Sequence, residues 1–380
     1  MKYLVGLDVG TSNVKAVLFD TEGNELKASV HETVVMNSNK YYSEQDMMQV
    51  WDQCANAIKD VVTCGIASPD DILGIGFSGQ GEGCWMIDKD GNPVQYASLW
   101  NDGRANELIP TLTEEQVKAL RISATGPNPS ATVLQLMWMK KNRPEAIEKA
   151  DTCFFAKDWI RFKLTGEKYI DYTDPSTSPL DIKEGKISKE IFDAFGISDC
   201  LRLFPPLRYS DECGGYITEE ASKITGLKVG TPCAMGALDV TITMAGVNAV
   251  NEGDVYTILG TTCCNGIVVD LNKVDLYGGT TYVCHPKKGL GIDLAATMAG
   301  TPNLDWMLDE IAGTHDFGEI ERMIKDIPAG SEGVIYHPYI TPSGERSPFY
   351  NPNARAGFLG LSTLATRAHM IKAVYEGIAY

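Results

Sequence analysis

The sequence has little positive charge for its size. Among 380 residues, 33 are lysine or arginine and 50 are aspartate or glutamate, so the formal net charge is 33 − 50 = −17. A surface this acidic repels phosphate backbones and anionic lipid headgroups. We therefore expect no nucleic acid and no membrane surface as a partner, and an anionic ligand must be held by local features such as backbone N–H groups.

Metal-binding and membrane-spanning patterns are also missing. The ten cysteines form no C-x-x-C pair and the five histidines no H-x-x-x-H spacing, which argues against a zinc site and is typical of reduced thiols in a cytosolic protein. Asp8 interrupts the apolar run near the N-terminus, and no stretch reaches the roughly 18 apolar residues of a membrane span. These absences predict a cytoplasmic protein.

Common nucleotide and catalytic motifs fail in this chain. The P-loop pattern G-x-x-x-x-G-K-[ST] does not occur. A G-x-G-x-x-G match at 74–79 is followed by residues that alternate like a strand, whereas a dinucleotide fingerprint needs a helix there. Neither the H-R-D of protein kinases nor a G-x-S-x-G elbow is present. The sequence therefore excludes a P-loop and a Rossmann site.

The composition that remains is that of a globular protein. Hydrophobic residues make up 44% and charged residues 22%, and the length suggests two or three domains at roughly 150 residues each. Alternating apolar residues predict strands at 3–8, 13–19, 25–34 and 72–77. Ser43 is expected to cap a helix. Helical spacing recurs at 47–61, 103–110, 114–122, 132–140, 157–165, 189–195, 218–225 and 240–249.

One pattern occurs twice. Gly10-Thr11-Ser12 lies between two apolar strands and is followed by Asp20, and a Gly-Thr-Thr triplet at 260–262 is followed by Asp270 in the same way, with an offset of 260 − 10 = 250. A third strand is expected after the second copy, at 278–283. Two interpretations stay open, namely unrelated β-hairpins with a common turn, or a duplicated domain with two nucleotide loops.

The repeated turn has the chemistry of a phosphate cradle. Glycine lets backbone N–H groups approach a phosphate, and Thr or Ser hydroxyls add donors without positive charge. Asp8, at the end of the first strand, is placed to hold Mg²⁺ directly or through water. Lys15 adds a point charge just beyond the turn.

Five segments together resemble the FGGY carbohydrate kinases. They are LVGLDVGTSNVKAVLFD at 4–20, GIGFSGQGEG to SLWNDGR at 74–104, AKDWIRFKLTGE at 156–167, GALDVTITMAGV with ILGTT at 236–262, and GERSPFYNPNARAGFLGL through AVYEGIAY at 344–380. The resemblance implies an α/β protein with the two-lobed, ribonuclease-H-like (actin/hexokinase-type) ATPase fold. It predicts an N-terminal lobe at 1–249 and a C-terminal lobe at 250–380.

The resemblance also implies roles for individual residues. Asp239 matches the family's catalytic aspartate, which accepts the proton of the attacking sugar hydroxyl; the alternative is that it caps the helix that follows. The phosphate and magnesium positions are matched by Asp8, Gly10, Thr11, Ser12, Lys15, Gly260, Thr261 and Thr262, which implies ATP and Mg²⁺.

The implied substrate residues lie between 80 and 104. Amides and carboxylates suit polyols because each can bridge adjacent hydroxyls, and an aromatic ring can cover the carbon chain. Xylulose kinases usually carry His where this chain has Glu82, which leaves ketopentoses and tetritols open. For Arg104 the alternative is an ion pair with Asp102 or Glu107 on a surface helix. The substrate set is Gln80, Glu82, Trp100, Asn101, Asp102, Arg104 and Asp239.

The sequence thus predicts an ATP-dependent, Mg²⁺-requiring kinase for a terminal hydroxyl of a small sugar or polyol, with a ketopentose such as xylulose as first choice and a tetritol or glycerol-type polyol as alternative. A homodimer is left open. The rival class is an actin- or Hsp70-like ATP-binding switch, which would not need Asp239 or the segment 76–104. Because residues 364–380 are helix-periodic without a stop signal and the family continues into an adenine-binding segment, we expect an incomplete second lobe.

Overall fold

The chain folds into two compact units. The computed structural model describes residues 1–277, 281–342, 344–345, 347, 351 and 353–380. The first unit comprises Met1–Asp254 and Val268–Asp293, and the second comprises Val255–Ile267 and Leu294–Tyr380. The chain passes from one unit to the other within β17 (Cys263–Asp270) and β19 (Leu290–Thr297).

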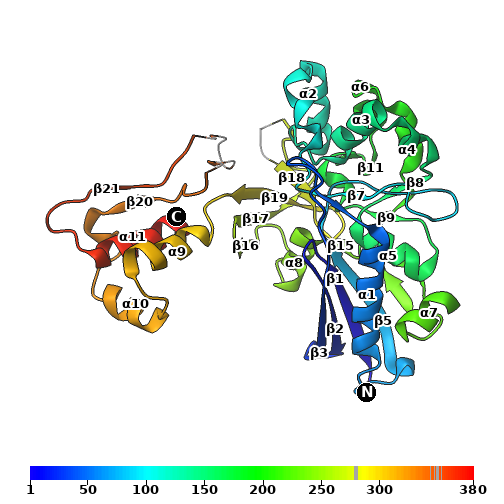
Figure 1. The fold of residues 1–380 in the computed structure, drawn as a ribbon, viewed down its shortest axis with the longest axis horizontal. Helices are drawn as coiled ribbons and strands as arrows, with labels where there is room; N and C mark the ends of the chain where they lie inside the picture. Colours follow the sequence, from blue (N-terminus) through cyan, green and yellow to red (C-terminus); the bar gives the residue numbers. More distant parts are fainter. Residues whose placement is uncertain (278–280, 343, 346, 348–350, 352) are drawn as a thin grey trace. The chain divides into compact units, whose positions relative to one another are not determined.

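A seven-stranded sheet forms the base of the first unit (Figure 1). Strand β1 (Tyr3–Val9) is antiparallel to β2 (Asn13–Asp20) and parallel to β5 (Ile72–Gly79). The short β15 (Ala237–Leu238) also pairs with β5. The full order is β13 (Cys213–Tyr216), β14 (Pro232–Ala234), β5, β1, β2 and β3 (Glu25–Glu32), with β15 beside β5.

The β-meander at the start of the chain follows from alternating side chains. Along β1, Tyr3, Val5, Leu7 and Val9 are buried while the residues between them are more exposed, so one face of the strand enters the core. Strands β1 and β2 pair from Tyr3–Asp20 to Val9–Val14, and residues 10–13 make the turn. The predicted strands at 3–8, 13–19, 25–34 and 72–77 are confirmed to within two residues at each end.

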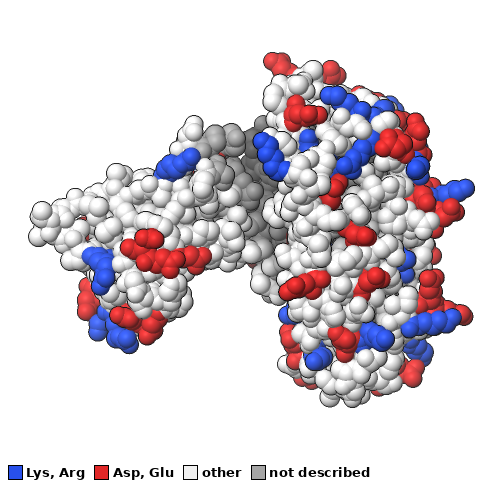
Figure 2. Space-filling view, viewed as in Figure 1, with Lys and Arg blue, Asp and Glu red and all other residues white. Residues whose placement is uncertain are grey.

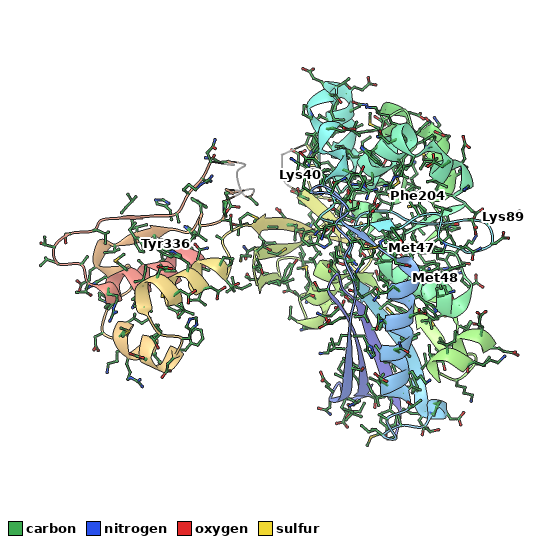
Figure 3. The ribbon with its side chains drawn as sticks, viewed as in Figure 1. Lys40, Met47, Met48, Lys89, Phe204 and Tyr336 are labelled. Atoms are coloured by element: carbon green, nitrogen blue, oxygen red, sulfur yellow. The ribbon has the colours of Figure 1, made fainter. Side chains whose placement is uncertain are left out.

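Helix α1 (Met47–Val62) packs on β2 and β3 and buries its apolar face (Figures 1 and 3). The prediction that Ser43 caps this helix is wrong. Asp46 is the N-cap, because its carboxylate accepts hydrogen bonds from the N–H groups of Met48 and Gln49. Glu44 and Gln45, which precede it, form the short strand β4.

The remaining helices of the first unit follow the predicted segments closely, except α4 (Pro144–Lys149), which was not predicted. They are α2 (Glu114–Leu120), α3 (Thr132–Asn142), α4 (Pro144–Lys149), α5 (Ala156–Thr165), α6 (Lys189–Ala194), α7 (Glu219–Thr225) and α8 (Asp239–Gly246). The segment 103–110 forms two short 3₁₀ turns, at Arg104–Glu107 and Ile109–Thr111, instead of a helix. Pro110 removes a backbone donor that a continuous helix would use.

The second unit contains the repeated turn and a helical core. Strand β16 (Val255–Leu259) is antiparallel to β17, with Leu259 opposite Cys263, so residues 260–262 form the turn. Helices α9 (Pro302–Met307), α10 (Phe317–Ile324) and α11 (Arg367–Ala379) accompany a hairpin of β20 (Ile335–His337) and β21 (Gly357–Leu359). Tyr336 on β20 enters this core (Figure 3), where its hydroxyl donates to Asn303 Oδ1 at 2.9 Å.

The structure describes only part of the third strand that was predicted after the second turn. Of the predicted strand 278–283, residues 278–280 lie outside the described residues, and β18 covers Thr281–Cys284.

Figure 2 shows acidic and basic side chains interspersed over the visible face. Within the described part of the chain, no helix combines the length and apolar character needed to cross a bilayer.

Candidate active site

The first turn needs glycine at its first position. A Cβ built on Gly10 would lie 2.6 Å from the carbonyl oxygen of Asn13, closer than side chains tolerate. Asp8, two residues earlier, is exposed and pairs across the hairpin with Lys15. The Lys15 ammonium lies 3.9 Å from Glu25 Oε2. The turn therefore presents backbone and the exposed Ser12, with the exposed Asp8 carboxylate nearby on β1.

Thr11 joins the predicted phosphate turn to the predicted substrate segment. Its hydroxyl donates to Gln80 Oε1 at 2.8 Å and accepts from Trp100 Nε1 at 2.9 Å. Gln80 Nε2 donates to Gln45 Oε1 at 2.8 Å, and Gln45 Nε2 donates to the Thr11 carbonyl at 2.8 Å. This closed network brings together three predicted residues and one, Gln45, that no sequence motif indicated.

Glu82 lies in a tight turn, residues 79–83, that follows β5; we call it the substrate turn. Its φ of 58° is left-handed, which is costly for a residue with a side chain. Asn128 Nδ2 donates to both carboxylate oxygens at 2.9 and 3.1 Å, and Ser130 Oγ donates to Oε2 at 2.5 Å. Asn128 and Ser130 were missed by sequence reasoning, since they lie in a polar loop far along the chain.

Arg104 forms the ion pair with Asp102 that the alternative interpretation gave, but it is buried and starts a 3₁₀ turn, so the surface helix of that alternative is wrong. Its guanidinium donates to Asp102 at 2.8 Å and to Glu44 Oε1 at 2.7 Å, and it stacks against the rings of Tyr42 and Trp138 at 4.5 and 5.3 Å. These bonds fix the loop that carries Trp100 and Asn101, both of which are exposed. Asp102 also accepts hydrogen bonds from the Ser43 N–H at 2.7 Å and from Gln135 Nε2 at 3.3 Å.

Asp239 is the first residue of α8 and lies directly after β15. Leu238 pairs with Gly79 in the sheet, so the carboxylate starts from a point beside the substrate turn. Val240 N–H donates to Asp239 Oδ1 at 2.6 Å, and the side chain is half-buried. The pKa of Asp239 is raised to about 6, chiefly by burial; the bond from Val240 lowers the pKa, and the negative charge of Asp8 raises it.

The second turn belongs to the second unit. Gly260 N–H donates to the Thr262 carbonyl at 2.9 Å, and Thr301 N–H donates to the Gly260 carbonyl at 2.8 Å. Thr261 is exposed. A Cβ on Gly300 would lie 2.4 Å from the carbonyl oxygens of both Gly260 and Thr261. The turn is thus shaped by close backbone contacts within its own unit.

The chain matches two family models over nearly its whole length. The N-terminal domain of the FGGY family of carbohydrate kinases matches residues 3–246, and the C-terminal domain matches residues 255–380. These matches cover all the predicted site residues.

Individual relatives are also sugar or polyol kinases by name. An erythritol kinase from Brucella abortus is 30% identical over 99% of this chain and 75% of its own length. A probable L-xylulose kinase from Haemophilus influenzae is 28% identical over 100% of this chain and 78% of its own length. The crystal structure of a xyloylose kinase from Brucella ovis superposes with a TM-score of 0.88 at 27% identity, covering 99% of this chain and 77% of that one. The fold is therefore the two-domain actin/hexokinase type, and the chain belongs to the FGGY family of carbohydrate kinases.

Proposed function

We propose that this carbohydrate kinase transfers the γ-phosphoryl group of ATP to a terminal hydroxyl of a ketopentose such as xylulose. The observation that carries the proposal is the position of Asp239. A carboxylate with a pKa of about 6 begins α8 beside Gly79 of the substrate turn. A base of this strength is ionised at neutral pH and still accepts a proton readily.

Asp239 would act on the substrate hydroxyl. It would accept the proton of the attacking oxygen as the P–O bond to the β-phosphate breaks and the bond to the sugar oxygen forms. The leaving group is ADP. Such transfers need positioning and charge neutralisation more than covalent chemistry. The hydrogen bond from Val240 keeps the carboxylate aimed without removing its second oxygen from use.

The substrate turn and the Trp100 loop would bind the sugar. Glu82 would offer oxygen atoms to adjacent hydroxyls, and the exposed ring of Trp100 can cover the carbon chain. Gln80 is buried, with its amide bonded to Thr11 and Gln45, and its contact with the sugar stays a prediction. Asn101 is exposed on the same loop. For Asp102 and Arg104, the buried contacts favour a positioning role beneath this loop, and direct contact with the substrate stays a prediction.

A tetritol is the second candidate substrate. The observation that favours it is Glu82, held as a carboxylate acceptor by Asn128 and Ser130 where xylulose kinases usually carry a histidine. The relative named erythritol kinase points the same way.

Each of the two turns would bind phosphate. Gly10, Thr11 and Ser12 with Lys15, and Gly260, Thr261 and Thr262, would contact phosphates, with the lobes divided at 249/250. The exposed Asp8 fits Mg²⁺, which prefers oxygen ligands and retains most of its waters. Bound Mg²⁺ would neutralise charge on the phosphates. Family membership stands against a non-enzymatic switch. We also propose a cytoplasmic location, with small molecules as substrates, and leave a homodimer open.

The test is ADP release coupled to NADH oxidation, measured with xylulose, ribulose, L-xylulose, erythritol and glycerol. We expect turnover that depends on one ketopentose or tetritol. A rate of ATP hydrolysis that no polyol changes would contradict the proposal.

A further inference from the structure

A fully buried charged cluster lies in the first unit and is made of Lys157, Asp158, Asp171 and Asp174. The Lys157 ammonium lies 2.9 Å from Asp158 Oδ2, 2.7 Å from Asp171 Oδ1 and 2.7 Å from Asp174 Oδ2, and none of the four side chains is exposed. The contact between Lys157 and Asp174 is an ion pair. The ammonium fills the space between three carboxylates that could otherwise hold a cation.

The cluster holds one ammonium among three carboxylates, and burial raises the pKa of Asp158 and of Asp174. Burial alone would lower the pKa of Lys157, but the charges of Asp158, Asp171 and Asp174 outweigh it and the pKa is raised. The lysine therefore stays charged. A buried ion pair adds little stability compared with apolar residues of the same size, so its presence calls for a role beyond holding the core together.

One chain of hydrogen bonds leads from the cluster to Asp239. Asp171 Oδ2 accepts from the Thr173 hydroxyl at 2.5 Å and from the Thr173 N–H at 2.9 Å. The same hydroxyl accepts from the N–H of Leu238 at 2.8 Å. Leu238 immediately precedes Asp239. The cluster thus fixes the backbone from which the Asp239 side chain starts.

The cluster also touches the back of the substrate turn. A Cβ on Gly79 would lie 3.1 Å from Lys157 Cβ, and a Cβ on Gly81 would lie 2.9 Å from Asp174 Oδ1. That oxygen is buried and has no hydrogen-bond partner among the described residues. Leu238 is closer still, since its Cδ1 lies 2.2 Å from the Cβ position of Gly81. Two glycines are therefore needed for this close packing.

We propose that Lys157, Asp171 and Thr173 are positioning residues for phosphoryl transfer. They fix the backbone that carries Asp239 against the substrate turn, without contact with the substrate. The inference rests on the proposed function, because it needs Asp239 as the base. Misplacement of a catalytic group by about 1 Å can reduce the rate about 100-fold, so one hydrogen bond at this position can affect the rate strongly.

The test compares variants of Thr173 with a matched control. Thr173→Val keeps the side-chain size but removes the hydroxyl, and Thr173→Ser restores it. Thr225 is the control, because its buried hydroxyl likewise donates one hydrogen bond, to the Ala221 carbonyl at 2.8 Å, and accepts one from an N–H, that of Leu227 at 3.3 Å. Thr225→Val thus removes one donated and one accepted hydrogen bond at the end of α7, away from the site.

The expected result is a split between kcat and KM. Thr173→Val lowers kcat at least about tenfold while the KM values for the polyol and ATP change less than about threefold, because positioning in the transition state is lost and binding is kept. Thr173→Ser returns kcat to within about threefold of wild type. Thr225→Val keeps the wild-type kcat. Hydrogen exchange of the Leu238 amide is faster in Thr173→Val than in Thr225→Val.

Two outcomes would overturn the inference. They are a wild-type kcat in Thr173→Val, or an equal loss in Thr173→Val and Thr173→Ser. If either outcome occurs while Asp239→Asn is inactive in the same assay, the inference is wrong and the proposed function still holds. Wild-type protein that phosphorylates no polyol would instead remove the proposed function itself. Thr173→Ala provides the same comparison should Thr173→Val not fold.

Discussion

Asp239 receives a backbone hydrogen bond, yet its surroundings oppose its ionisation. Burial is the larger effect, and the pKa of the carboxyl rises from 3.8 to about 6. Catalytic groups commonly have pKa values that are displaced toward the working pH at the expense of stability. The raised pKa of Asp239 can therefore be tested by experiments that need no substrate.

Asp239→Asn should become more stable relative to wild type as the pH rises. Between pH 3.8 and 6 the folded wild-type protein binds a proton more tightly than the unfolded chain, so its stability falls with increasing pH through this window. The difference in free energy of unfolding should grow by up to about 3 kcal/mol. Denaturant unfolding of both proteins at several pH values measures it, with the exposed Asp90→Asn as control. A pH-independent difference would contradict the raised pKa.

Glu82→Ala should weaken polyol binding selectively. The carboxylate is oriented by Asn128 and Ser130 despite a left-handed backbone, an arrangement that suits an acceptor for substrate hydroxyls. The KM for the polyol should rise at least about tenfold, the usual size for one lost hydrogen bond to a charged group. The KM for ATP should change little. Steady-state kinetics checks this, with the exposed Glu184→Ala as control, and an unchanged polyol KM would remove Glu82 from the site.

Site residues that belong to a sequence motif could be predicted, whereas the residues that hydrogen-bond to them could not. Asp8, Thr11 and Gln80 have local sequence signals, and Thr11 and Gln80 do lie in contact. Gln45 and Asn128 reach the same region from distant segments, through contacts that no local periodicity encodes. Lys157 lies in a segment predicted only as a helix, at 157–165, and its three carboxylate partners become visible in three dimensions only.

The two turn-containing hairpins are similar in pattern and different in detail. Residues 10–13 separate the last pair, Val9 and Val14, of the first hairpin, and residues 260–262 separate the last pair of the second. Gly10 is required by the nearby Asn13 carbonyl, whereas a Cβ on Gly260 would have only Thr262 O nearby, at 3.9 Å. The repeat at an offset of 250 therefore predicts the two hairpins but not the different length of their turns.

Gly300→Ala should disturb the second turn. The new Cβ would meet the carbonyl oxygens of Gly260 and Thr261 at 2.4 Å, so the turn must move. If this turn binds phosphate, the Kd for ATP rises at least about fivefold, which corresponds to about 1 kcal/mol of lost binding. Nucleotide titration by calorimetry measures it. Gly357→Ala is the control, because its Cβ would meet no atom within 4 Å. Unchanged affinity would separate the turn from the nucleotide.

Helix and strand positions were predicted well where periodicity is strong. The segments at 132–140 and 157–165 are α3 and α5 with shifts of two residues or fewer at their ends. The helix predicted at 103–110 was wrong, because Pro110 lacks the backbone N–H that a continuous helix would use. The helix expected from 364 begins at Arg367, since Thr366 forms a capping box with His369.

At the scale of the whole molecule, the acidic surface affects how an anionic nucleotide approaches. With a net charge of −17, long-range repulsion should slow ATP association at low ionic strength. Screening at about 0.15 M salt, where the Debye length is about 8 Å, should remove much of this effect. The association rate for ATP should therefore increase with salt in stopped-flow measurements, whereas the KM for the neutral polyol stays constant. A rate that falls with salt would indicate a dominant basic site.

The family and the two-unit organisation could be predicted from the order of motifs, and the exact units could not. The predicted boundary at 249/250 places residues 268–293 with the C-terminal lobe, whereas in the structure they pack with the first unit. The boundary of the lobes stays a prediction, since packing and family matches divide the chain differently. This chain spans 75% to 78% of the two curated relatives described above.

The most direct test is phosphoryl transfer from γ-labelled ATP to the preferred polyol by wild type and Asp239→Asn. We expect labelled sugar phosphate from the wild type and a loss of at least about 1,000-fold in Asp239→Asn, the upper part of the range for a general base. Calorimetry should show ATP binding within about threefold of wild type. Substantial transfer by Asp239→Asn, with binding intact, would show that another group accepts the proton.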